Sequence, residues 1–259
     1  MISQHIPVMM KEAIEALNVR DSLDYIDVTF GGGGYSEEIL KKANCNLISI
    51  DKDPTVNNYA KKLKFKYKKR FTFVNNGFEN LEGIIKDNNK TSVSGGIVAD
   101  LGVSSFQLDK SDRGFSFNKD GPLDMRMSRK GITAQELIYS LNEKELAKLL
   151  RDYGDEEKSR AIAKMIVKER NKEVLDTTFK LVKLIKRLKK NDYKRKNHPA
   201  TKSFQALRIA TNQELKSLKK LLMISEKILL PGARLVLITF HSIEDRIVKF
   251  FFNEISGKK

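Results

Sequence analysis

The feature that most restricts the fold of this chain is a short apolar run that ends in four consecutive glycines. Residues 25–30 are rich in aromatic and β-branched side chains, which favour a strand, and Gly31–Gly34 follow directly. Glycine allows the positive φ of a tight turn. A helical pattern opens at Ser36, and a second apolar run, residues 46–50, stops at Asp51. This order predicts a βαβ unit with two parallel strands and a right-handed crossover.

Three later apolar runs extend the same pattern. They cover residues 71–74, 96–99 and 234–240, and the second of them leads into Asp100. Together with the first two runs they give five strands, which suits one parallel sheet flanked by helices. We therefore expect an α/β protein with a Rossmann-like core.

The long segment between the fourth and fifth strands carries helix signals only. Thr133 and Glu136 have the spacing of a capping box, and apolar residues recur at helical spacing farther along. We expect an inserted all-helical, basic subdomain over residues 109–206. The sheet domain is then discontinuous and consists of residues 1–108 and 207–259.

The chain of 259 residues is strongly basic. Its 49 Lys and Arg against 33 Asp and Glu give a formal net charge of +16. This balance favours a polyanionic partner such as nucleic acid, although an AT-rich coding sequence also enriches lysine. Residues 61–70 contain seven basic side chains and two aromatic ones, and residues 180–202 contain ten basic side chains and one acid. Both runs are candidates for RNA binding, and solvated helix faces are the alternative.

Cysteine and hydrophobicity narrow the class of protein. Cys45 is the single cysteine, which excludes an internal disulfide and a cysteine-based zinc cluster. No apolar run approaches the roughly 18 residues of a membrane span, and the first residues lack a basic-then-apolar signal pattern. We expect a cytoplasmic protein with no metal and no membrane contact.

The glycine turn and Asp51 predict a nucleotide-like cofactor. An acid at the end of the second strand, 20 residues after Gly31, can accept hydrogen bonds from a ribose diol. Nicotinamide nucleotides and S-adenosylmethionine share this layout, and a tight turn without any ligand also needs glycine. Because one nucleotide-binding half is followed by a helical insert, S-adenosylmethionine is favoured.

The other strand ends supply further candidates. Ligands of such sheets bind at the carboxyl ends of the strands, so Phe78, Asp100 and Gln107 are expected to project toward one crevice. Phe78 can stack on an adenine, and Asp100 can accept hydrogen bonds from amino groups of the cofactor or of a target base. A core phenylalanine and a loop-capping aspartate are the alternatives.

Nine sequence blocks resemble one known family. In order along the chain they are His5–Val8, Asp27–Gly31, Ile50–Pro54, Asp100–Ser105, Arg113–Phe117, Asp120–Met127, His198–Thr201, Phe204–Ile209 and Phe240–Arg246. So many long blocks in one order are highly specific. The sequence resembles the ribosomal RNA small subunit methyltransferase H family.

The resemblance implies an S-adenosylmethionine-dependent enzyme that methylates the exocyclic 4-amino group of a cytidine. The target is expected in the decoding centre of small-subunit (16S) ribosomal RNA, within an assembled or nearly assembled subunit. A class I methyltransferase core with a helical insert is implied as well. The cofactor positions of the family fall on Gly33, Gly34, Tyr35, Asp51, Phe78, Asp100 and Gln107.

A few positions depart from the family pattern. Gly32 and Tyr35 stand where the family usually has an arginine and a histidine, and Phe106 replaces a proline before Gln107. Backbone contacts of the turn are expected to survive these changes. The family also continues beyond Lys259 with a closing basic segment and the last strands of the sheet, so either this sequence is truncated or one sheet edge is left open.

Methyl transfer to an aromatic amine is a one-step displacement in which the protein supplies alignment and proton removal. Methylation of a ring carbon needs a cysteine nucleophile instead, and Cys45 lies away from the strand ends. We therefore expect a nitrogen target on a base that leaves its stack. Asp100 is the main catalytic candidate, and His5 and His241 are candidate bases or base-orienting residues, with structural roles as the alternative.

The expected RNA contacts come from the second basic run and its end. They are Lys189, Lys190, Lys194, Arg195 and His198. Two other functions stay open at this point. One is a non-catalytic RNA-binding or ribosome-assembly factor on a methyltransferase scaffold, and the other is a nicotinamide-dependent oxidoreductase.

Overall fold

The computed structural model describes residues 7–189 and 198–257. The chain divides into two compact units, residues 1–102 with 215–259, and residues 103–214. The boundaries expected from the sequence, after Leu108 and before Leu207, fall inside two helices of the second unit.

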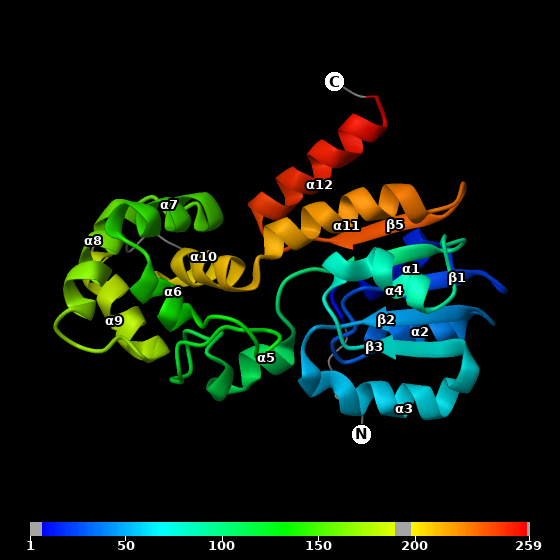
Figure 1. The fold of residues 1–259 in the computed structure, drawn as a ribbon, viewed down its shortest axis with the longest axis horizontal. Coiled ribbons are helices and arrows are strands. Elements are labelled where there is room, and N and C mark those ends of the chain that lie inside the picture. Colours follow the sequence, from blue (N-terminus) through cyan, green and yellow to red (C-terminus); the bar gives the residue numbers. More distant parts are fainter. Residues whose placement is uncertain (1–6, 190–197, 258–259) are drawn as a thin grey trace. The chain divides into compact units, whose positions relative to one another are not determined.

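The first unit is built on a five-stranded parallel sheet with the strand order β3-β2-β1-β4-β5 (Figure 1). This confirms the predicted α/β class, and β3 and β5 form the two edges of the described sheet. The strands are β1 (Asp24–Asp27), β2 (Asn46–Ile50), β3 (Phe71–Val74), β4 (Gly96–Asp100) and β5 (Arg234–Ile238).

Helices cover both faces of this sheet. On β1 and β2, Tyr25 and Leu47 join an apolar cluster with α1, α2 and α3, whereas Ile26 and Ile48 join a second cluster with α4 and α11. Strands buried on both faces are typical of parallel sheets. The helices of this unit are α1 (Met10–Leu17), α2 (Gly34–Lys42), α3 (Asn57–Tyr67), α4 (Leu81–Asp87), α11 (Glu214–Ile228) and α12 (Ser242–Ile255), with the 3-10 turns η1 (Pro54–Val56), η2 (Lys68–Arg70) and η3 (Phe78–Asn80).

The βαβ unit forms, with shifts at its turn. β1 ends at Asp27 rather than at Phe30, but its backbone pairing continues beyond the strand. The Val28 amide donates to the Val98 carbonyl at 3.0 Å and the Phe30 amide donates to the Ile50 carbonyl at 3.0 Å. α2 begins two residues earlier than predicted because Gly33, with φ of 82°, turns the chain directly into the helix.

The regular secondary structure of the described part of the second unit is helical, apart from one isolated bridge between Pro122 and Thr177, and loops such as residues 114–133 connect the helices. α7 packs against α8 and α10 around a single apolar core. The predicted capping box at Thr133 and Glu136 forms and begins α6. The helices are α5 (Ser105–Asp109), α6 (Ala134–Ser140), α7 (Glu143–Gly154), α8 (Ser159–Arg170), α9 (Thr178–Leu188) and α10 (Thr201–Asn212), with the 3-10 turn η4 (Ser111–Arg113).

Candidate active site

The glycine turn is closely packed at Gly33 and Gly34, where neighbouring side chains leave no room for a Cβ atom. Gly31 and Gly33 have φ of 50° and 82°, in the left-handed region that favours glycine. A Cβ atom on Gly33 would lie 2.9 Å from the Phe30 ring, and one on Gly34 would lie 2.5 Å from Cγ of Pro7. The turn therefore packs closely against Phe30 and Pro7 at the carboxyl end of β1, the end of such a sheet where ligands bind.

Asp51, which follows the end of β2, contacts the glycine turn. Its Oδ2 accepts a hydrogen bond from the Gly31 amide at 2.7 Å, and its Oδ1 accepts one from the Asp53 amide at 2.8 Å. Burial raises the pKa of the Asp51 carboxyl to about 6. Each oxygen keeps lone-pair capacity beyond its backbone partner, so the carboxylate can also accept from a ribose hydroxyl.

Asp27 is a second buried acid, and our reasoning from the sequence did not select it as a site residue. The side chain is 0% exposed at the end of β1. It accepts hydrogen bonds from the Ser36 hydroxyl at 2.6 Å and from the Thr29 amide at 3.1 Å. Burial raises its pKa to about 6, and the charge of Asp51 adds to this shift. The sequence itself contained an indication of this site, because an acidic residue inside an apolar strand run is buried and then needs hydrogen-bond partners.

Asp100 ends β4, and one of its oxygens has no partner. The Asp100 amide donates to Oγ1 of Thr29 at 2.7 Å, which fixes the backbone beside the glycine turn. The side-chain Oδ1 is buried and accepts no hydrogen bond in the described structure. Burial, together with the charges of Asp27 and Glu244, raises the pKa of Asp100 to about 7. Such an orphaned buried acceptor is typical of a ligand site.

Glu244 and His241 lie at the start of α12, just after β5. Glu244 is buried, and its Oε2 accepts a hydrogen bond from the Phe240 amide at 3.1 Å. Nδ1 of His241 accepts one from the Glu244 amide at 3.3 Å and so caps the helix. Nε2 of His241 lies 3.2 Å from Oε1 of Glu244, without hydrogen-bond alignment. The sequence analysis named His241 as a candidate site residue, but it did not select Glu244.

The electrostatics of this end of the sheet are acidic. Within the described ranges, no Lys or Arg forms an ion pair with Asp27, Asp51 or Asp100. All three carboxyls have raised pKa values for the same first reason, burial. A cationic ligand would relieve their repulsion, whereas a phosphate would increase it. The site is therefore suited to a cation and unsuited to holding an RNA backbone.

Two other predicted cofactor residues in this unit lie within its packing. Tyr35 is 3% exposed, and its hydroxyl donates to the carbonyl of Val8. Burial, followed by the charge of Asp100, raises its pKa above the ordinary range. The ring of Phe78 is half-buried and packs on the edge of the apolar cluster under α4. Phe78 keeps an accessible part, whereas the Tyr35 hydroxyl is committed to a structural bond.

Gln107 and His198 belong to the second unit. The Gln107 side chain completes the capping box of α5, where its Oε1 accepts from the Ser104 amide at 3.0 Å. The His198 ring stacks on Phe117 with centroids 4.6 Å apart and planes 2° from parallel. Burial and the nearby charges of Lys186 and Lys189 lower the pKa of His198, so the ring is neutral at neutral pH.

Lys189 corrects a prediction, because its ammonium is buried. Nζ forms an ion pair with Glu156 at 2.7 Å, with side chains 1% and 0% exposed, and also donates to the Pro199 carbonyl at 2.7 Å. Ser203 donates to the same Glu156 carboxylate at 3.0 Å. A buried, paired lysine ties helices together and cannot reach a phosphate. The other predicted residues of this kind, Lys190, Lys194 and Arg195, lie outside the described residues, as does His5.

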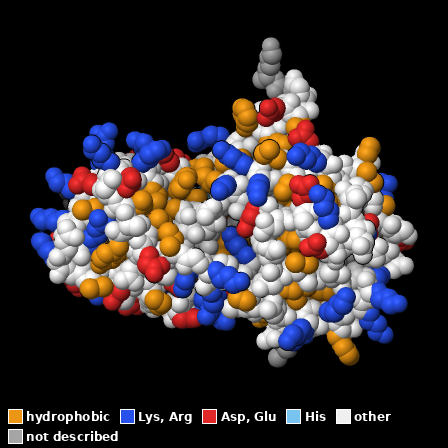
Figure 2. All heavy atoms as spheres, viewed as in Figure 1, with side chains coloured by type: hydrophobic (Ala, Val, Ile, Leu, Met, Phe, Trp, Pro, Cys, Tyr) orange, Lys and Arg blue, Asp and Glu red, His pale blue; other side chains and the backbone are white. Residues whose placement is uncertain are grey.

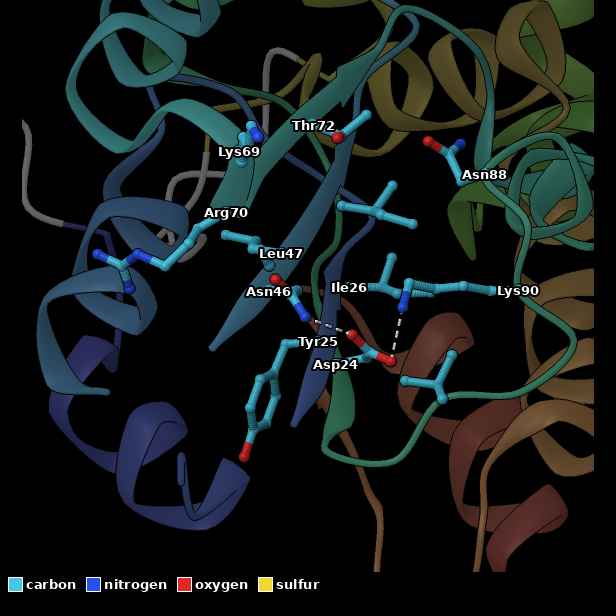
Figure 3. A pocket seen from close by; sticks show the side chains of 12 residues that line it. Asp24, Tyr25, Ile26, Asn46, Leu47, Lys69, Arg70, Thr72, Asn88 and Lys90 are labelled. Carbon is cyan, nitrogen blue, oxygen red and sulfur yellow. Dashed lines mark hydrogen bonds and ion pairs between the residues drawn. The ribbon is translucent and has the colours of Figure 1, made fainter. Parts of the chain in front are cut away.

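A pocket of about 240 Å³ lies at the opposite, amino end of the strands (Figure 3). Its lining includes Asp24 and Asn46, the first residues of β1 and β2. Asp24 forms an ion pair with Lys90 at 2.7 Å and accepts from Asn46 at 3.1 Å, as the dashed lines in Figure 3 show. The pocket is therefore separate from the acidic site.

Over residues 7–189 and 198–257, no group of three or more His, Cys, Asp or Glu side chains could hold a metal ion. No helix in those ranges is long and apolar enough to cross a membrane.

Comparison with known proteins identifies the family. The sequence model of the MraW methylase family matches residues 2–259. A protein of Rickettsia massiliae (strain Mtu5) is 48% identical over 258 residues, which cover 100% of this chain and 82% of that protein. One of Rickettsia akari (strain Hartford) is 45% identical over 258 residues and covers 100% and 83%. Both relatives are named Ribosomal RNA small subunit methyltransferase H. The chain belongs to the MraW methylase family.

Proposed function

We propose that this protein transfers a methyl group from S-adenosylmethionine to the exocyclic 4-amino group of a cytidine in the decoding centre of small-subunit ribosomal RNA. Family membership and the names of the relatives support RNA methylation. The observation that carries the proposal is the acidic end of the sheet, where the orphaned Asp100 carboxyl lies beside the glycine turn.

The residues at this end of the sheet fit S-adenosylmethionine. Asp51 has lone pairs for a ribose diol, and the glycine turn lies directly beside it, because the Gly31 amide donates to its Oδ2 at 2.7 Å. Phe78 offers an accessible ring for an adenine. The unpaired carboxylates suit a ligand that carries a sulfonium and an ammonium charge. When bound, the cofactor supplies an electrophilic methyl group, and no metal is needed.

Asp100 is the residue that we assign to the amine. Its buried Oδ1 can accept a hydrogen bond from an exocyclic amino group and hold the nitrogen lone pair toward the methyl carbon. Burial raises the pKa of this carboxyl to about 7, into the neutral range, which suits a group that takes up and releases a proton. The positive charge of the cofactor favours its ionised form.

His241 acts in this proposal as a positioning residue. Its Nδ1 accepts a hydrogen bond from the Glu244 amide at 3.3 Å, and its Nε2 lies 3.2 Å from Oε1 of Glu244 without hydrogen-bond alignment. Nδ1 cannot take a substrate proton without losing this hydrogen bond. His241 therefore fixes the start of α12 and the Glu244 carboxylate, whose charge in turn raises the pKa of Asp100.

The state of the only cysteine supports a nitrogen target. Methylation of a pyrimidine carbon needs a thiolate that attacks the ring. Cys45 is 1% exposed, its Sγ contacts the Ile39 carbonyl at 3.8 Å, and burial raises the pKa of its thiol. A buried thiol with a raised pKa is a poor nucleophile. Direct displacement by an exocyclic nitrogen requires no such group.

The test is methyl incorporation from labelled S-adenosylmethionine into small ribosomal subunits that lack the modification, followed by nucleoside analysis. Label in 4-amino-methylated cytidine is the expected result. Label in another nucleoside would overturn the assigned position. Absence of label together with absence of cofactor binding would favour a non-catalytic RNA-binding factor, and retention of a nicotinamide nucleotide would favour an oxidoreductase.

A further inference from the structure

The exposed face of α3 combines lysines with an isolated aromatic ring. Phe65 is 88% exposed, the largest exposure among the large apolar side chains of the described chain. Its neighbours on the solvent side include Lys61 and Lys62, one turn earlier, while Ala60 and Leu63 bury the opposite side of the helix. In Figure 2, Lys and Arg side chains gather along α3, at the lower right, around a projecting hydrophobic side chain.

The structure separates the basic side chains of this run into two groups. Three are used inside the unit. Lys64 donates to the Phe71 carbonyl at 2.6 Å, Lys66 pairs with Glu37 at 2.6 Å, and Arg70 donates to the Leu40 and Ala43 carbonyls at 3.3 and 3.0 Å. Those bonds hold α3 in place. Because of these bonds, the three side chains are not available to bind a phosphate of a ligand.

The second group consists of Lys61, Lys62, Lys68 and Lys69. All four are exposed, and none forms an ion pair or a hydrogen bond with another described residue. Lys62 lies over the Tyr59 ring at 5.8 Å, which stiffens its position. We name these four lysines and Phe65 the α3 patch. Four unpaired charges around an exposed ring leave a surface without a partner inside this unit.

An RNA methyltransferase needs such a surface outside its reaction site. The carboxylates Asp27, Asp51 and Asp100 repel phosphate, and the buried Lys189 cannot bind it. The α3 patch begins close to the cofactor site, because only η1 separates Asp51 from α3. From Asn57 to Phe65 the helix rises about 12 Å, at about 1.5 Å per residue. The patch is therefore a neighbouring contact and not part of the reaction site.

We propose that the α3 patch binds a single-stranded segment of RNA, with a base stacked on Phe65 and phosphates on the four lysines. The proposal rests on the proposed RNA substrate and names where that substrate is held. Duplex RNA hides the faces of its bases, whereas unpaired bases stack on exposed aromatic rings. Lys69 also lines the pocket in Figure 3, so the basic surface continues past the end of the helix.

The test measures RNA binding directly, by fluorescence anisotropy of a labelled oligouridine of about 12 nucleotides, without cofactor. In the test variant Lys61, Lys62, Lys68 and Lys69 become Gln. If each lysine neutralises one phosphate of a single strand, the negative slope of log K against log salt is less steep in the variant, by about 3. The affinity gap between wild type and variant then widens roughly 600-fold between 1 M and 0.1 M salt.

The matched control changes four exposed lysines of α11, Lys216, Lys219, Lys220 and Lys227, to Gln. It lowers the net charge of the chain by the same amount, and we expect its slope to stay close to that of the wild type. Equal losses in both variants would overturn the proposal, because they would show an effect of net charge alone.

Phe65 provides the second arm of the test. Phe65→Ala should weaken binding about 5- to 150-fold, the range for loss of one stacked base, with an unchanged salt slope. Phe65→Trp should retain the affinity. An unchanged affinity of Phe65→Ala, or tighter binding of a duplex of the same length, would overturn the proposal. Patch-dependent binding by a protein that shows no methyl transfer would refute the proposed function alone.

Discussion

Asp27 allows the acidic character of the site to be tested through folding stability. The carboxyl is 0% exposed, and burial raises its pKa from 3.8 to about 6. A shift of about two units corresponds to about 3 kcal/mol of differential free energy. The unfolded chain ionises near pH 3.8 and the folded chain near pH 6, so between these values the folded state binds more protons. Its stability therefore falls as pH rises through this window.

Asp27→Asn removes this dependence with little change in shape. The Asn carbonyl can accept from the Thr29 amide, and its amide can donate to Ser36, whose hydroxyl can turn toward Ser49 at 2.7 Å. The free energy of unfolding of the variant, minus that of the wild type, should rise by about 3 kcal/mol between about pH 4 and about pH 7. Urea unfolding without cofactor, repeated across this range, measures the difference.

The matched control for this experiment is Glu82→Gln. Glu82 is exposed in the same unit, and its hydrogen bond with Lys86 lowers its pKa. That bond stabilises the protein above the unfolded pKa of the carboxyl and is lost as pH falls, so this variant should lose relative stability as pH rises. The sign is opposite to that of Asp27→Asn. For Asp27→Asn, a change in its stability difference with pH smaller than about 1 kcal/mol would refute the assignment of a buried carboxylate that has no ion pair.

Further predictions concern the reaction, the turn and the helical unit. Asp100→Asn should lower kcat by about 10²- to 10⁴-fold at saturating cofactor, and an unchanged kcat would remove Asp100 from the reaction. Gly33→Ala should destabilise the protein by about 1–3 kcal/mol, because its φ is 82° and the Phe30 ring blocks a Cβ; an unchanged Tm would contradict this. Lys189→Met alone should lose about 3–5 kcal/mol, and adding Glu156→Leu should recover most of it in a thermal unfolding series.

Local patterns in the sequence determined the class of fold and predicted an acid beside the glycine turn. The glycine run after residues 25–30 predicted a parallel βαβ unit, and the structure confirms it. The spacing from Gly31 to Asp51 predicted an acid beside the turn, and the two residues share a hydrogen bond of 2.7 Å. The pair at Thr133 and Glu136 predicted a helix start that forms as expected. These features depend on neighbours along the chain or on the fixed order of strands, so they are readable without coordinates.

Only the tertiary structure decided which charged side chains are buried. Lys189 lies in a basic run that favoured RNA contact, yet its partner Glu156 is 33 residues away and the two are buried together. Asp27 and Glu244 gain their role because Asp100 lies near them in space, at the end of another strand. Phe65 and Leu63 are two residues apart in one helix, but only Leu63 packs on the sheet. The burial of a residue depends on every element that packs around it. The free-energy cost of a charge is several kcal/mol when the charge is buried and small when it is exposed. For this reason the sequence predicted the candidate site residues beside the glycine turn, whereas the structure separated the lysines that hold the fold from those that stay exposed.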